Sequence, residues 1–77
     1  MTFLLPRTSA GTVVAAQAVA IHGDRYVDVT LALDDAPGAP LAARLGASDC
    51  PANLEPGERV EARLVLGNLV GLARAAR

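Results

Sequence analysis

Two stretches of the chain alternate between apolar and polar residues, and this alternation restricts the fold more than any other feature. Between Arg25 and Asp34, and again between Arg59 and Leu66, every second residue is Val, Leu or Ala. A period of two directs alternate side chains to opposite faces of a β-strand, so each stretch predicts a strand with one face on a core and the other in water. The sequence therefore predicts an all-β protein.

Three further strands follow from weaker patterns. Residues 11–21 are rich in Val and end before Gly23-Asp24, a pair typical of hairpin turns, so a strand is favoured over a helix, which is the alternative. Residues 40–46 alternate behind Pro40, which restricts that strand to a sheet edge. The predicted strands are residues 11–21, 26–34, 40–46, 59–66 and 69–74.

Two tight turns flank the fourth predicted strand. Pro56 presets the backbone for the second position of a β-turn and Gly57 supplies the positive φ of the third, so Glu55–Glu58 is predicted to be a type II turn. The pair Gly67-Asn68 separates the last two strands and favours a type II′ hairpin turn. Gly71, inside the last strand, is a candidate for a bulge.

Residues 46–54 break the alternation between the third and fourth strands. Ser48 or Asp49 can cap a helical turn and Pro51 is acceptable near its start, so one short helix or 3₁₀ turn is expected. Three strands, a helical turn and two strands are the element order of an OB-type barrel. We therefore expect a five-stranded OB-like barrel, with an SH3-like barrel as the nearest alternative and a small β-sandwich as a weaker one.

Composition argues against several classes of function. The chain has 77 residues, a net charge of −1 and seven basic residues, all of them Arg, so it has no charge that favours nucleic acid or an anionic membrane. Without Lys it has neither a Schiff-base amine nor a P-loop lysine. Phe3 and Tyr26 are its only aromatic residues, too few to stack single-stranded nucleic acid in the manner of OB proteins. Neither a signal sequence nor a membrane-spanning apolar run is found, so we expect a cytoplasmic protein without membrane insertion.

No pattern indicates a catalytic or metal site. His22 lies at a hairpin turn without a partner in sequence. Cys50 is the only cysteine, so no internal disulfide is expected and the thiol is predicted to be buried and inert. The acidic residues that could form pairs are interpreted as solvated charge; they are Asp34, Asp35, Glu55, Glu58 and Glu61. The hydroxyl residues lack the sequence context of a catalytic nucleophile; they are Thr8, Ser9, Thr12, Thr30 and Ser48. The glycines are interpreted as turn and bulge residues; they are Gly11, Gly23, Gly38, Gly46, Gly57, Gly67 and Gly71. We expect no enzyme activity, no metal and no cofactor, and no ligand-binding residue is indicated.

Three segments resemble the TOBE domain, the transport-associated OB domain. They are GTV at Gly11–Val13, the hairpin from YVDVTLAL into PLAARL at residues 26–45, and NLEPGERVEARL with the closing LVGLAR at residues 53–74. The most specific piece is the Leu-x-Pro-Gly-x-x-Val run at Leu54–Val60. The resemblance covers about residues 7–74, and it divides the chain into an N-terminal edge strand or linker at residues 1–10 and a TOBE/OB-like domain at residues 11–77.

The resemblance implies a regulatory and dimer-contacting domain at the C-terminus of the ATPase subunit of an ABC importer. The alternative setting is a free-standing molybdenum-pterin-binding-like protein or a molybdate-responsive regulator, which binds molybdate or tungstate between domains. That setting usually carries Ser-Ala-Arg-Asn before Gly-Thr-Val and a Lys-Ser-like pair before the last strand. This chain has Leu4-Leu5-Pro6-Arg7 where Ser-Ala-Arg-Asn is expected, and it has no Lys for the Lys-Ser-like pair. The transporter setting therefore fits better.

The strand at residues 12–21 is predicted to be apolar on both faces. One face carries Val14, Ala16, Ala18 and Ala20, and the other carries Val13, Ala15, Val19 and Ile21. A single barrel buries only one of them, so the other needs a cover. The candidates are Phe3-Leu4-Leu5, the helical turn or a second copy of the chain. A two-fold homodimer is the simplest closed solution, and a monomer that covers the strand within its own chain is the alternative.

Overall fold

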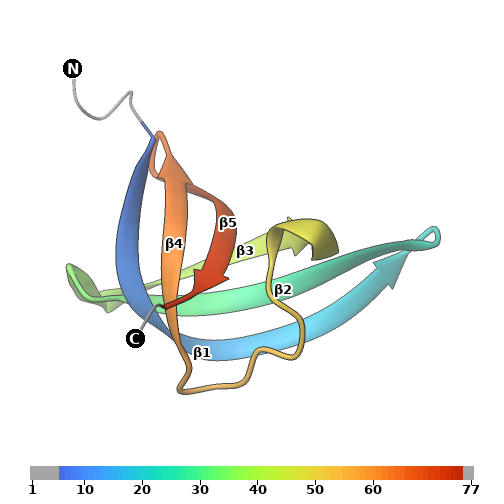
Figure 1. Cartoon of the computed structure of the whole chain (residues 1–77), viewed down its shortest axis with the longest axis horizontal. Helices are drawn as coiled ribbons and strands as arrows, with labels where there is room; N and C mark the ends of the chain where they lie inside the picture. Colours follow the sequence, from blue (N-terminus) through green and yellow to red (C-terminus); the bar gives the residue numbers. More distant parts are fainter. Residues whose placement is uncertain (1–5, 76–77) are drawn as a thin grey trace.

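The structure is a computed structural model that describes residues 6–75. Within this range five antiparallel strands form one sheet in the order β3-β2-β1-β4-β5 (Figure 1). The strands are β1 (Arg7–Ile21), β2 (Asp24–Leu33), β3 (Ala36–Gly46), β4 (Arg59–Val65) and β5 (Asn68–Arg74). The predicted all-β class is confirmed.

All five predicted strands are present, with different bounds at several ends. β1 begins at Arg7 and not at residue 11, and the strand over residues 11–21, for which a helix was the alternative, is confirmed. β3 begins at Ala36, so Pro40 lies inside it. Proline is tolerated there because β3 is an edge of the sheet, which is the position predicted from Pro40.

The predicted helical turn between the third and fourth strands is a 3₁₀ turn, Ala47–Asp49. Gly46 stands at its N-cap and no side chain caps it, so the prediction that Ser48 or Asp49 caps the turn is wrong. Both residues lie inside the turn, which begins directly at the end of β3 and leaves no residue between for a cap. The backbone is extended again at Cys50, before Pro51.

The sheet curls strongly but is not closed. β1 bends through the molecule, so that residues 7–12 pair with β4 and residues 11–21 pair with β2 (Figure 1). The two edge strands, β3 and β5, contact each other without being hydrogen-bonded neighbours. One long strand therefore belongs to both halves of the sheet, and the core fills the space between them.

The core is aliphatic and comes from every strand. Its fully buried side chains include Leu31, near the C-terminal end of β2, and Leu64 and Val60 of β4. No charged or polar side chain is buried among the described residues. The buried hydrophobic residues are Val13, Val29, Leu31, Leu33, Leu45, Cys50, Val60, Ala62, Leu64, Leu69 and Leu72.

A bulge in β1 changes which of its residues share a face. The β1–β2 register shifts between Val13 and Ala15, which leaves Val14 without a partner in β2. One extra residue reverses the alternation that follows it. Val13 is buried, Ala16 and not Ala15 packs against the core, and Val14 is 49% exposed. The predicted grouping of Val14 with Ala16, and of Val13 with Ala15, is therefore wrong.

The predicted turn at Glu55–Glu58 is confirmed. Gly57 has φ of 93°, and the Glu58 backbone N–H donates to the Glu55 carbonyl at 3.2 Å. The turn is also attached to β1, because the Gly57 N–H donates to the Val13 carbonyl at 2.8 Å and the Val13 N–H donates to the Glu58 carbonyl at 2.9 Å. These bonds continue the β1–β4 ladder past the end of β4.

Both two-residue hairpin loops lie one residue earlier than predicted. Val65 pairs with Asn68, so the last loop is Leu66-Gly67, and positive φ at both positions (53° and 80°) marks a type I′ turn instead of type II′. The first loop is His22-Gly23, with φ of 52° and 84°. The type I′ twist matches that of the strands, and this outweighs the cost of a left-handed Leu66.

Leu66→Asn is expected to raise the free energy of unfolding by about 1 kcal/mol. The left-handed region costs an ordinary residue roughly 1–2 kcal/mol, and Asn tolerates it better than Leu. Asn-Gly is also the preferred pair in type I′ turns. Urea denaturation followed by circular dichroism measures the change. The control is Val70→Asn, which replaces another exposed apolar side chain at a position without positive φ; equal gains from both variants would contradict the turn argument.

Candidate functional site

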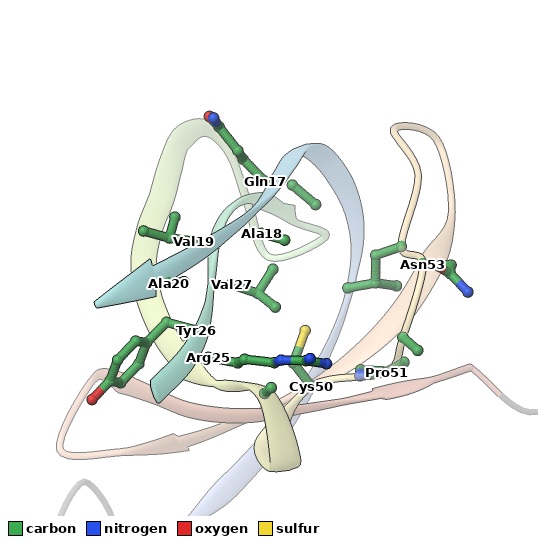
Figure 2. Close-up of a pocket in the computed structure, with 14 residues that line it drawn as sticks. Gln17, Ala18, Val19, Ala20, Arg25, Tyr26, Val27, Cys50, Pro51 and Asn53 are labelled. Carbon is green, nitrogen blue, oxygen red and sulfur yellow. The ribbon is translucent and has the colours of Figure 1, made fainter. Parts of the chain in front are cut away.

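A hollow of about 630 Å³ lies between the sheet and the segment that joins β3 to β4 (Figure 2). One wall is formed by residues 16–20 of β1 and residues 25–27 of β2, and the other by residues 47 and 50–54. Figure 2 shows the Val27 and Cys50 side chains directed into the hollow and the Tyr26 and Asn53 side chains directed away from it. The hollow is therefore mostly apolar inside.

The hollow exists because the β1 wall consists of small side chains. Ala16 is opposite Val29 and Ala18 is opposite Val27 in the β1–β2 ladder. Since alanine fills little space, these side chains leave room between the sheet and the segment at residues 50–54, and Ala18 and Ala20 remain exposed. The density of alanine at residues 15–20 is the sequence signal that could have indicated this hollow.

Cys50 lies where the hollow meets the core. Its side chain is buried, as predicted, and it is a free thiol. Burial raises the pKa of the Cys50 thiol, an effect that the nearby Arg74 charge offsets only in part. A raised pKa keeps the group as a thiol near neutral pH, and a thiol is a poor nucleophile compared with a thiolate.

Among the residues that the structure describes, Arg25 is the only charged one that lines the hollow. It is exposed, and among residues 6–75 its guanidinium group has no ion-pair or hydrogen-bond partner. Four other arginines do pair with acids, and Arg44 of β3, for example, donates to both Asp28 carboxylate oxygens at 2.7 and 3.0 Å. The hollow therefore has an apolar interior and one uncompensated positive charge.

The acidic residues interpreted as solvated charge are largely organised into ion pairs across the sheet. Asp34 accepts two hydrogen bonds from Arg59, which also donates to the Thr12 hydroxyl at 2.9 Å. Asp35 pairs with Arg7 at 3.2 Å, and the pairing of Glu58 with Arg74 is at 2.9 Å. These pairs join residues far apart in sequence, so no local pattern could have indicated them, and none of them faces the hollow.

Three of the paired carboxyl groups have lowered pKa values. Hydrogen bonds from Arg44 lower the pKa of Asp28, and hydrogen bonds from Arg59 lower the pKa of Asp34. The pKa of Glu58 falls because of hydrogen bonds from Arg74 and from the Glu55 backbone N–H. A carboxyl group whose pKa is lower in the folded state than in the unfolded state stabilises the fold at pH values above its unfolded-state pKa. This stabilisation is lost as the pH falls through its folded-state pKa.

The melting temperature is accordingly expected to be level from pH 7 down to about 5 and to fall below about pH 4, near the ordinary pKa of an aspartate. Asp34→Asn should flatten part of the acid limb, because the variant has no proton to take up at that position. Glu61→Gln, which removes a carboxylate without an ion-pair partner in the described range, is the control and should leave the limb unchanged. A limb as steep in Asp34→Asn as in the parent would contradict the assignment.

The remaining residues considered from sequence do not meet at one place. His22 is exposed in the first hairpin loop, and the Ser9 hydroxyl donates to Asp35 at 3.5 Å on the surface. Phe3-Leu4-Leu5 and the other residues before Pro6 lie outside the described range. No group of three or more His, Cys, Asp or Glu residues within residues 6–75 could hold a metal ion.

The fold and the hollow define a small all-β protein with one open, curled sheet. Comparison of the chain with protein-family models, curated proteins and solved structures finds no match. The resemblance to the TOBE domain therefore depends on the residues quoted for it. No helix in the described range is long and apolar enough to span a membrane.

Proposed function

We propose that the chain is a non-catalytic, OB-like regulatory domain that contacts an ABC-type import ATPase or a second copy of itself. The observation that supports this most is the strand order together with the 3₁₀ turn between β3 and β4. Pairing of β3 with β5, which already contact each other, would complete a five-stranded barrel. OB barrels are themselves partly open, so this order is consistent with their architecture.

The distribution of charge supports contact with a partner in preference to chemistry. Asp34, Asp35 and Glu58 are each engaged by an arginine, and the thiol of Cys50 is held in its unreactive form. The hollow offers apolar surface and one positive charge, which suits binding. The most specific piece of the TOBE resemblance, Leu54–Val60, forms the turn attached to β1, so its role in this proposal is to support the fold.

The coding region around Met1 provides the first test of the transporter setting. We expect an ABC-type ATPase in the same reading frame or in an adjoining gene, which would also place the chain in the cytoplasm. The purified ATPase should then hydrolyse ATP at a different rate with and without this domain, and the domain alone should show no hydrolysis. An equal rate in both preparations would contradict a regulatory role.

Binding of a small oxyanion is the second candidate function, and the observation that favours it is the unpaired Arg25. Calorimetric titration with molybdate, tungstate and sulfate separates the two settings. The transporter setting predicts no saturable heat with any of the three. Saturable binding of molybdate or tungstate that is lost in Arg25→Gln would contradict the transporter setting and support the free-standing oxyanion-binding protein.

Self-association is expected to be weak and to depend on protein concentration. The face of β1 and β2 directed away from the hollow carries Val19, Ile21 and Tyr26, all of them half-buried, with Val19 opposite Tyr26 in the ladder. A two-fold dimer would cover this patch on both copies. Sedimentation equilibrium should show a mass that rises with concentration in the parent and in Val70→Asp, and a monomer mass in Val19→Asp. A monomer mass for the parent at the highest concentration would rule the homodimer out.

A further inference from the structure

The C-terminal half of β1 has a free backbone edge beside the hollow. The β1–β4 ladder ends at Thr12, and Val13 extends it by its bonds to Gly57 and Glu58. From Ala15 to Ile21, β1 pairs with β2 alone. Alternate backbone N–H and C=O groups along this edge therefore have no backbone partner within residues 6–75.

This edge lacks the features by which proteins usually protect an exposed strand. The stretch from Ala15 to Ile21 contains no proline, no glycine and no charged residue. The free edge of β3, by contrast, carries Pro37 and Pro40. Prolines and charges prevent a further strand from pairing, so β1 offers the less protected edge of the two.

The hollow would receive the side chains of a strand added to this edge. Alternate side chains of an added strand point to the same face, and on this side they would meet Val27, Cys50 and Leu54. A volume of about 630 Å³ lies within the range of pockets that bind ligands. Backbone bonds supply affinity and such pockets supply specificity when a peptide is bound by strand addition.

The charge of the hollow selects among peptides. Arg25 is the only charged lining residue and has no acidic partner in the described range. A carboxylate on the incoming strand would pair with it by charge-assisted hydrogen bonds. An acidic segment with apolar side chains at alternate positions therefore complements both the edge and the hollow.

We propose that the free edge of β1 and the adjoining hollow bind an extended, acidic segment of another protein by β-strand addition. The inference goes beyond the proposed function, because such a site would serve the chain whether or not it works with a transporter ATPase. The segment adds to the edge at Ala15–Ile21, inserts apolar side chains between β1 and residues 50–54, and places its carboxylate at Arg25.

The test uses the full chain labelled with ¹⁵N and a capped heptapeptide, Ser-Glu-Thr-Val-Thr-Val-Ser, whose Glu and Val side chains lie on one face of an extended strand. The peptide should shift the amide resonances of residues 15–21 and slow their hydrogen exchange, with little change in the β4–β5 hairpin. A peptide with Lys in place of Glu should bind at least tenfold more weakly. A peptide N-methylated at alternate residues along its pairing edge keeps the side chains but loses the backbone bonds, and it should not bind.

Two variants separate the charge from the rest of the site. Arg25→Gln should weaken binding of the Glu peptide about tenfold, which corresponds to about 1.4 kcal/mol, and leave binding of a matched Gln peptide unchanged. Arg63→Gln removes another arginine that has no ion pair in the described range and does not line the hollow, and it should have no effect. The amide spectrum of each variant shows directly that it is folded.

Three results would overturn the proposal. The first is the absence of any change at residues 15–21 with millimolar Glu peptide. The second is equal binding of the N-methylated peptide, which would show adsorption to apolar surface without strand addition. The third is protection of the same amides that grows with protein concentration when no peptide is present, which would assign the edge to a second copy of the chain.

Discussion

Leu31→Ala is expected to lower the free energy of unfolding by about 2–5 kcal/mol. Leu31 is fully buried near the C-terminal end of β2, where it is opposite Val13 on one side and Leu41 on the other. Truncation removes buried apolar surface and leaves a cavity that sheet neighbours on both sides cannot easily fill. A chain of 77 residues has a total stability of roughly 4–12 kcal/mol, so the variant should be largely unfolded by mild denaturant.

Urea denaturation of the parent and the variant measures this loss. The control is Leu66→Ala, which removes the same atoms from a side chain that is 56% exposed. We expect the control to change stability by about 0.5 kcal/mol or less. Similar losses in the two variants would mean that Leu31 does not lie in the core as described.

Gly57→Val is expected to cost about 1–3 kcal/mol. Gly57 has φ of 93°, a conformation strained for any residue with a branched Cβ, and no heavy atom lies within 4 Å of an added Cβ. The cost therefore comes from the backbone and not from a clash. Because this turn is bonded to Val13 of β1, the strain would also weaken the attachment of β4 to β1.

Gly38→Val is the control for the turn. An added Cβ at Gly38 also meets no atom within 4 Å, but its backbone does not have a positive φ. The thermal midpoint should fall clearly in Gly57→Val and little in Gly38→Val. An unchanged midpoint in Gly57→Val would refute the type II turn.

Much of the fold could be predicted because its causes are local. Alternation at residues 25–34 and 59–66 indicates strands wherever a core is available, and Pro40 requires an edge in any sheet. The pair Pro56-Gly57 is compatible with few turn types, because Pro fixes φ at the second position and Gly allows a positive φ at the third. The helical turn between β3 and β4 was expected from an interruption of the alternation. Each of these predictions depends on the conformations open to a few neighbouring residues.

The regulatory function and its ATPase partner stay predictions, since they come from the TOBE resemblance. Only the β-rich fold that the resemblance implies is present in the structure, as one open sheet. The candidate hollow is a different case, because it depends on the spacing between β1 and the segment at residues 50–54. Alanine at residues 15–20 permits a hollow there but does not require one.

The strand segments, the position of the type II turn and the burial of Cys50 follow from the sequence, because backbone preference and the need to bury apolar side chains act on each segment directly. The bulge at Val14, the one-residue shift of the hairpin loops and the pairing of Asp34 with Arg59 depend instead on how the strands pair in the folded protein. These features are set when paired strands come into register, and a single extra residue in one strand then reverses the faces of the residues that follow it. The free edge of β1 has the same origin, because it exists only where β4 stops following β1.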